Sequence, residues 1–148
     1  MQIAVIGASV CSPAEAEAAE TAGYLIAGNG AVLLSGGRSG VMEAACRGAR
    51  EAGGTTVGIL PGREGGNPYC DVTIKSGLGI ARNAVLVSSA DAVVAIGGGA
   101  GTLSEIGIAL KLGIPVFGVR TWEIEGVFAC ATPEEAVLMA VRAARLSG

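Results

Sequence analysis

Short, continuous apolar runs alternate along this chain with longer segments in which apolar residues recur every three or four positions. The runs are typical of parallel strands buried on both faces, and the longer spacing is typical of helices. The pattern predicts strands at Gln2 to Ile6, Ala31 to Leu34, Thr55 to Leu60, Asp71 to Ile74, Asp91 to Ile96, Pro115 to Val119 and, on a weaker pattern, Val127 to Ala129. It predicts helices at Pro13 to Ala27, Gly40 to Ala52, Leu78 to Ser89, Thr102 to Leu112 and Pro133 to Leu146.

Strands and helices alternate from one end of the chain to the other, and no linker interrupts them. This order predicts one α/β domain over residues 1–148, a doubly wound, mostly parallel sheet of about seven strands with helices on both faces. In such folds ligands bind outside the carboxyl ends of the strands, where the strand order reverses. We therefore expect the site among the turns at that edge.

Four glycine-containing turns follow predicted strands and should meet at this edge. Glycine in a strand-to-helix turn often answers only a backbone requirement. Four such turns together, with Ser and Thr interleaved, favour a ligand site instead. The candidate binding residues in the first three turns are Gly7, Ala8, Ser9, Gly36, Gly37, Arg38 and Gly77.

The fourth turn, in the sequence GGGAGTLSE from Gly97 to Glu105, carries the strongest signal. Glycines let backbone N–H groups approach a phosphate closely, and the helix that follows adds unpaired donors and the positive end of its dipole. This arrangement predicts an anion site. Its candidate binding residues are Gly97, Gly98, Gly99, Gly101 and Thr102.

The segment from Thr102 to Glu105 has a second interpretation as a capping box, in which the two side chains satisfy each other's backbone N–H groups. The same spacing occurs at Ser12 to Glu15 and at Thr132 to Glu135, each with proline at the first helical position. Spacing alone therefore makes Glu105 equally a cap or a functional carboxylate. The glycines before it, absent from the other two boxes, favour function.

The amino-acid composition limits the kinds of catalytic and metal sites that the chain can form. With 51% hydrophobic residues among 148, the chain can bury a substantial core. It contains no histidine, and its four cysteines form no CxxC pair, so the usual zinc sites and Ser-His or Cys-His nucleophiles are not expected. We expect no metal site, and the cysteines are interpreted as small buried apolar residues.

The charge and the apolar pattern also bear on partners and location. A net charge of −3 without a basic cluster, and an aromatic content of 3%, argue against a nucleic-acid partner. No apolar run approaches the roughly 18 residues of a membrane span, and the N-terminal MQIAVIGAS resembles a first strand, not a signal peptide. We expect no membrane partner and a cytoplasmic location.

The standard nucleotide motifs are absent. The chain has no GxxxxGK[ST] sequence, which argues against P-loop hydrolysis of ATP or GTP. The sequence GLGIAR places Arg82 where a dinucleotide-binding turn has its third glycine, and no acidic residue follows at the expected distance, so NAD is a weak candidate. Arg82 instead offers a permanent cation at the same sheet edge. The alternative is a surface ion pair.

With these motifs the chain resembles the lysine-decarboxylase-like Rossmann proteins of the SLOG superfamily, which include LOG cytokinin riboside 5'-monophosphate phosphoribohydrolases and molybdenum cofactor carrier proteins. LOG enzymes carry PGGxGTxxE after a strand, and Gly97 to Glu105 matches this except that Gly97 replaces proline. Their upstream Arg-Lys pair is Arg82-Asn83 here, and SGGRSGVMEAA is similar to their GGxxGVM turn. The departures and the short length resemble a small, uncharacterised branch of the family.

The resemblance implies two functions. In one, Arg82 and Glu105 are catalytic and hydrolyse the N-glycosidic bond of a nucleoside 5'-monophosphate. In the other, the protein binds or carries a nucleotide or a molybdopterin-type ligand without turning it over. Retention of Arg82 and Glu105 favours the enzyme, and loss of the lysine and proline favours the binder. In both, the partner is a phosphorylated small molecule and no further cofactor is required.

Lysine decarboxylation, the activity in the family's common label, is not expected. It needs a lysine in Schiff-base linkage to pyridoxal phosphate. The only lysines are Lys75 and Lys111, and the sequence around neither indicates a cofactor pocket.

The helices at Leu78 to Ser89 and Thr102 to Leu112 are apolar on nearly all sides. A helix packed only on a sheet should show a polar stripe, so this pattern predicts a homo-oligomer, either a dimer or a dimer of dimers. The alternative is that loops cover both helices. Because the LOG-like proteins pair through such helices, pairing would place Arg82 near the subunit boundary.

Overall fold

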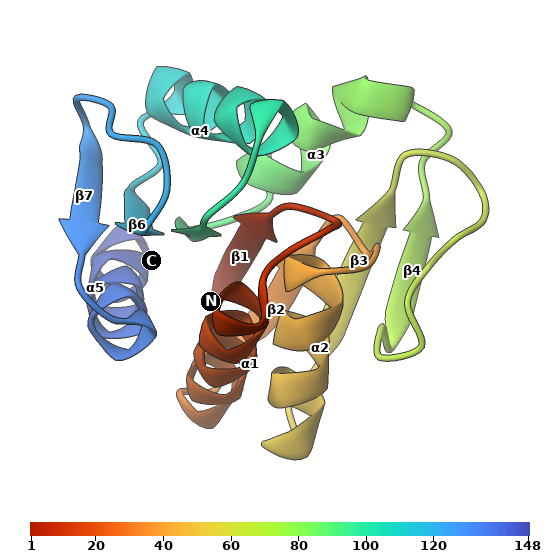
Figure 1. Ribbon diagram of the computed structural model, residues 1–148, viewed down its shortest axis with the longest axis horizontal. Helices are drawn as coiled ribbons and strands as arrows, with labels where there is room; N and C mark the ends of the chain where they lie inside the picture. Colours follow the sequence, from red (N-terminus) through yellow and green to blue (C-terminus); the bar gives the residue numbers. More distant parts are fainter.

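The computed structural model describes all 148 residues as an α/β sandwich (Figure 1). Its strands are β1 (Gln2–Gly7), β2 (Val32–Ser35), β3 (Thr56–Leu60), β4 (Val72–Lys75), β5 (Ala92–Ile96), β6 (Val116–Val119) and β7 (Val127–Cys130). Its helices are α1 (Pro13–Gly28), α2 (Val41–Glu51), a 3-10 turn η1 (Gly79–Ala81), α3 (Arg82–Ser88), α4 (Ala100–Leu112) and α5 (Pro133–Ser147). All expected strands and helices are confirmed, most of them to within one or two residues at each end.

The seven strands form one parallel sheet in the order β4-β3-β2-β1-β5-β6-β7. The chain builds outward from β1 to β4, then returns to β5 beside β1 and builds toward β7. The order therefore reverses between β1 and β5, where the loops after these two strands separate and leave room for a ligand. The Rossmann-like, doubly wound fold predicted from the alternation is confirmed.

Two apolar layers hold the helices against the sheet. One layer packs α1, α2 and α5 under β1, β2 and β5, and is centred on fully buried residues such as Ile3, Val5 and Ile26. The other packs α3 and α4 on the opposite face, with Leu86, Val87 and Ile106 at its centre. Figure 1 shows α3 and α4 lying together on one side, with α1 and α2 on the other. None of the helices combines the length and the apolar character that a membrane-spanning segment needs.

The face that carries α3 and α4 remains incompletely covered. Exposed apolar side chains on or beside it are Val72, Ile74, Leu78, Ile80, Val85 and Leu112. Val72 and Ile74 pair in register with Val57 and Ile59, which belong to the layer under α3, so they continue the same face to the sheet edge. The apolar helix surfaces noted in the sequence are thus only partly buried within one copy of the chain.

Two helix starts differ from the sequence-based expectation. The segment from Leu78 begins with the 3-10 turn η1, and regular α-helix starts only at Arg82. Helix α4 begins at Ala100, two residues before the expected Thr102, with Gly99 as its N-cap and no side-chain cap. An α-helix that starts at Ala100 leaves Thr102 inside its first turn, where its hydroxyl cannot act as the N-cap.

Candidate functional site

A cavity of about 450 Å³ opens at the carboxyl edge of the sheet where the strand order reverses. It is called the Arg82 cavity below. Its lining comes from the β1–α1 turn, the β2–α2 turn with the start of α2, the residue after β3, η1, α3 and the first two turns of α4. The lining residues are Gly7, Ala8, Ser9, Arg38, Met42, Pro61, Gly79, Ile80, Arg82, Asn83, Gly99, Gly101, Thr102 and Glu105. Residues predicted from four separate sequence segments therefore meet in one place.

The other predicted residues lie elsewhere. Gly36 sits behind the cavity, and a β-carbon there would approach Arg82 Nη2 to 2.9 Å, so the missing side chain makes room for the guanidinium. Gly37 adopts a positive φ of 74°, which glycine tolerates, in the turn just before Arg38. Gly97 and Gly98 line a neighbouring cavity. Gly77 borders neither cavity, and nothing lies within 4 Å of its missing β-carbon.

The first turn of α4 faces the Arg82 cavity through Gly101 and Thr102. The N–H of Leu103 is the first to find an acceptor, at Gly99 O (3.0 Å). The amides before it have no intrahelical acceptor, and the helix dipole places partial positive charge at the same point. The geometry therefore presents backbone donors to the cavity.

Glu105 does not cap the helix. It lies in the second turn of α4, 7% exposed, and lines the cavity, whereas the box at Ser12 and Glu15 forms in full and the Thr132 side chain caps Glu135 N. Burial raises the pKa of the Glu105 carboxyl to about 7, against the opposing effect of the Arg82 charge. The capping alternative is thus excluded, and a functional role for this carboxyl stays a prediction.

Arg82 reaches the same cavity from the first turn of α3. Burial lowers the pKa of its guanidinium, the charge of Glu105 opposes this, and the charge of Arg38 adds to it. Its Nε is buried and has no hydrogen-bond partner. Arg82 forms no ion pair with Glu105, because the salt bridges of the chain join Arg47 to Glu20 and Arg50 to Asp71. The surface ion-pair interpretation of Arg82 is therefore wrong.

Asn83, which occupies the position of the LOG lysine, is a buried connector between α3 and α4. Its Oδ1 accepts a hydrogen bond from Arg82 Nη1, and its Nδ2 donates to Ser104 Oγ at 3.0 Å. Ser104 in turn donates to Gly101 O at 2.6 Å. The amide fixes the guanidinium relative to the first turn of α4, a role that the sequence did not reveal.

The loop between β3 and β4 is hydrogen-bonded to the β2–α2 turn, which carries Arg38. Asn67 N donates to Gly37 O at 2.8 Å, and Asn67 Nδ2 donates to Arg38 O at 2.9 Å. Asn67 is itself 9% exposed, and its Oδ1 accepts from Tyr69 N at 2.9 Å. The end of this loop therefore fixes the backbone at Arg38 and so supports its position.

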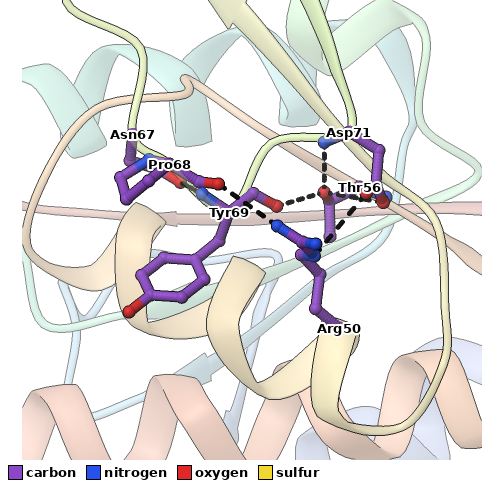
Figure 2. Close-up of polar contacts among 6 residues, drawn as sticks. All are labelled: Arg50, Thr56, Asn67, Pro68, Tyr69 and Asp71. Atoms are coloured by element: carbon purple, nitrogen blue, oxygen red, sulfur yellow. Dashed lines mark hydrogen bonds and ion pairs between the residues drawn. The ribbon is translucent and has the colours of Figure 1, made fainter.

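Figure 2 shows how that support is fastened to the domain. Thr56 Oγ1 donates to Tyr69 O at 2.5 Å, and Thr56 N donates to Asp71 Oδ2 at 2.9 Å. Arg50, at the end of α2, donates to Pro68 O at 3.2 Å and lies 3.6 Å from Asp71. These contacts tie the loop to both β3 and α2.

A second, larger cavity of about 900 Å³ lies on the other side of the glycine loop from Gly97 to Gly99. It is called the Trp122 cavity below, and it shares Ala8 and Gly99 with the first. Trp122 Nε1 donates to Gly99 O at 3.1 Å, and Thr121 Oγ1 donates to Gly97 O at 2.7 Å. The segment after β6 is therefore fastened to the loop.

Sequence reasoning missed this cavity because it looked for glycine turns. The available signal was position: the sequence RTW, from Arg120 to Trp122, directly follows a buried strand and so had to reach the same sheet edge. Arg120 is also the one non-glycine residue with a positive φ, 50°. Such a conformation is uncommon outside glycine and is often found near functional sites.

The conformation of the loop beside this second cavity requires glycine at position 97. Its φ of 54° is inaccessible to proline, and a β-carbon there would collide with the carboxylate of Glu15. The departure from the LOG motif at this position therefore accompanies a different loop conformation, in which a helix α1 carboxylate lies against the loop.

The SLOG cluster4 family matches residues 1–146. The chain belongs to this family. An uncharacterized protein of Archaeoglobus fulgidus is 47% identical over 139 residues, which cover 93% of this chain and 92% of that protein. The cytokinin riboside 5'-monophosphate phosphoribohydrolase of Mycobacterium tuberculosis is 36% identical over 103 residues, or 64% of this chain and 55% of the enzyme. The resemblance to the LOG-like group is confirmed.

Solved structures of family relatives agree over nearly the whole chain. The molybdenum cofactor binding protein of Rippkaea orientalis is 38% identical, with a TM-score of 0.88 and 93% of each chain covered. The molybdenum cofactor carrier protein of Chlamydomonas reinhardtii is 34% identical, with a TM-score of 0.90, and the match covers 99% of this chain and 98% of that one. Of the two functions implied by the sequence, these neighbours favour the binding protein.

Proposed function

We propose that this chain binds a phosphorylated small molecule of the nucleotide or molybdenum-cofactor type in the Arg82 cavity and holds it without turnover. The observation that carries the proposal is the convergence of Arg38 and Arg82 on the free first turn of α4. The names of the similar solved structures, a molybdenum cofactor binding protein and a molybdenum cofactor carrier protein, support a binding role.

The chemistry of the cavity suits a phosphate. Backbone amides at a helix N-terminus donate to phosphate oxygens while the dipole favours the negative charge. A guanidinium adds two parallel donors that match the same oxygens. Arg82 has a donor to spare, since Nη2 takes part in no hydrogen bond while Nη1 holds the guanidinium on Asn83. We expect the ligand to supply the missing acceptors.

Calorimetric titration with AMP, GMP and inorganic phosphate tests this proposal. Removal of one charged hydrogen-bond partner costs about 1.5–3 kcal/mol, so Arg82→Gln should weaken nucleotide binding about 10-fold or more. Arg145→Gln, an exposed position on α5, is the matched control and should bind as the wild type does. Equal binding by both variants, or no binding by the wild type, would contradict the proposed site.

A second candidate function rests on the near-neutral pKa of Glu105 and its position in a cavity shared with Arg82. A carboxyl group that titrates near pH 7 can transfer protons, and a carboxylate near a sugar can stabilise an oxocarbenium-like transition state. The phosphoribohydrolase relative supports this alternative. Chromatographic detection of free base from nucleoside monophosphates decides between the two, and any turnover should fall on the order of 100-fold in Glu105→Gln.

A further inference from the structure

The glycine loop that separates the two cavities has opposite polarity on its two sides. Toward the Arg82 cavity it leads into the free amides of α4, beside two arginines. Toward the Trp122 cavity its carbonyls at Gly97 and Gly99 accept the hydrogen bonds of Thr121 and Trp122. One side thus offers free donors, whereas on the other side the loop carbonyls are already paired and two acidic side chains line the cavity.

The acidic side chains of the Trp122 cavity are Glu15 and Glu123. Glu15 Oε1 accepts the Ser12 N–H within the capping box, while its Oε2 lies against Gly97 and has no hydrogen-bond partner. Glu123 is exposed at the other wall and takes part in no hydrogen bond or salt bridge. With Arg120 as the one cation, the lining carries a surplus of negative charge that disfavours a phosphate there.

The indole of Trp122 supplies a flat apolar surface beside these carboxylates. It is 41% exposed, yet its Nε1–H is tethered to Gly99 O, so its orientation is fixed while part of its surface stays accessible. Aromatic side chains held in this way stack on planar heterocycles, and neighbouring polar groups then select the hydrogen-bonding edge of the ring.

We propose that the Trp122 cavity binds a planar heterocycle with a 2-amino-4-oxopyrimidine edge, as in guanine or a pterin, stacked on Trp122 with its N–H groups donated to the carboxylates of Glu15 and Glu123. That edge carries adjacent N–H donors, which match the two unpaired oxygens of Glu123 and the unpaired Oε2 of Glu15, because an ionised carboxylate only accepts hydrogen bonds. Adenine places a ring acceptor next to its amine and does not match. The inference rests on the proposed function in that the phosphate of the same ligand lies across Gly99 in the Arg82 cavity.

This placement separates the two candidate functions. A heterocycle in the Trp122 cavity lies on the far side of the glycine loop from Glu105, which lines only the Arg82 cavity. The bond between the ring and the rest of the ligand would then lie away from Arg82 and Glu105. Holding without cleavage follows directly from that geometry.

Trp122 is the only tryptophan of the chain and lines this cavity, so its fluorescence reports on a ligand bound there. We expect saturable quenching by GMP and by a pterin phosphate, with AMP at least about 10-fold weaker because one matched hydrogen bond is lost. Inorganic phosphate should bind by calorimetry without quenching. The GMP and pterin titrations also show which of the two sources of this edge binds more tightly.

A pair of variants isolates the carboxylate. Glu15→Gln keeps the capping box, which accepts Gln in place of Glu, but replaces one acceptor oxygen by a donor. It should reduce the preference for GMP over AMP about 10-fold. Glu17→Gln, an exposed position on the same helix, should leave it unchanged.

The outcomes separate this inference from the proposed function. Equal affinity for AMP and GMP, or nucleotide binding by calorimetry without quenching, overturns the heterocycle site while the phosphate site stands. Quenching by guanosine or by an unphosphorylated pterin, with no effect of phosphate or of Arg82→Gln, supports the heterocycle site and overturns the phosphate site. Absence of any binding overturns both.

Discussion

The two cavities at the carboxyl edge of this sheet share a wall but are built in opposite ways. The Arg82 cavity is formed by strand-to-helix turns and contains two arginines, free amides and one buried carboxyl. The Trp122 cavity is formed partly by a non-helical segment after β6 and contains an indole and two carboxylates. A single glycine loop therefore separates a donor-rich part of the edge from an acidic part, because the free amides of α4 lie on one side of it and the carboxylates of Glu15 and Glu123 lie on the other.

Of the substitutions predicted to alter the two cavities, Gly97→Pro should have the largest effect on stability. It restores the LOG motif in the glycine loop between the cavities. Proline cannot adopt the φ of 54°, and its ring would collide with Glu15. We expect a loss of about 3 kcal/mol or more in the free energy of unfolding, measured by urea denaturation.

The control for this variant is Gly107→Ala in the middle of α4, where φ is helical and nothing lies within 4 Å of the missing β-carbon. It should be neutral or stabilising by about 0.5–1 kcal/mol. A Gly97→Pro protein as stable as the wild type would mean that the loop readily takes the conformation of the LOG motif, and that the wall between the cavities is not fixed.

The contrast between these cavities also explains what could be predicted from the sequence. The strands, helices and sheet edge followed from apolar runs and glycine turns, because these patterns reflect burial and backbone geometry that are local in the chain. Gly7, Arg38, Arg82 and Glu105 were brought together by topology alone. Glycine turns gave no indication of Trp122, because its position depends on a hydrogen bond to Gly99 from a distant segment.

Other errors have equally specific causes. The capping-box spacing at Thr102 left Glu105 ambiguous, since the choice depends on whether Gly99 or Thr102 begins the helix, and the glycine backbone permits both. Asn83 looked like a lost lysine, whereas its function in the structure is to connect Arg82 to Ser104. Such side-chain contacts between helices have no local signature in the sequence.

The second prediction concerns the buried carboxyl of the Arg82 cavity. Burial raises the pKa of Glu105 from 4.5 to about 7, so the folded protein prefers its neutral form. The corresponding stability is fully present below pH 4.5 and is lost as the pH rises through about 7. Glu105→Gln does not titrate, so it should exceed the wild type in stability by up to about 3 kcal/mol above pH 7 and lose this advantage near pH 4.5.

Urea denaturation of both proteins between pH 4.5 and 8.5 measures this difference. Glu123→Gln serves as the comparison from the Trp122 cavity, because that carboxylate is exposed whereas Glu105 is 7% exposed. A pH-independent stability difference between Glu105→Gln and the wild type would show that the Glu105 carboxyl is not desolvated, and the contrast between a buried and an open acidic group would disappear.

Substitution of Ile80 should have the smallest effect on the free energy of unfolding. It should nevertheless change the oligomeric state. This side chain is 78% exposed, lines the mouth of the Arg82 cavity and belongs to the uncovered apolar face of α3 and α4. Exposed apolar surface of this extent marks an interface, and we predict a homodimer through this face. The partner would then complete the Arg82 cavity and leave the Trp122 cavity open.

Sedimentation should give a dimer for the wild type and a monomer for Ile80→Glu, whose unfolding free energy as a monomer should change by less than about 0.5 kcal/mol. Leu138→Glu places the same charge on an exposed leucine of α5, on the opposite side of the sheet, and should remain dimeric. A monomeric wild type at micromolar concentration would contradict the interface, and a dimer that Ile80→Glu leaves intact would assign it to another face.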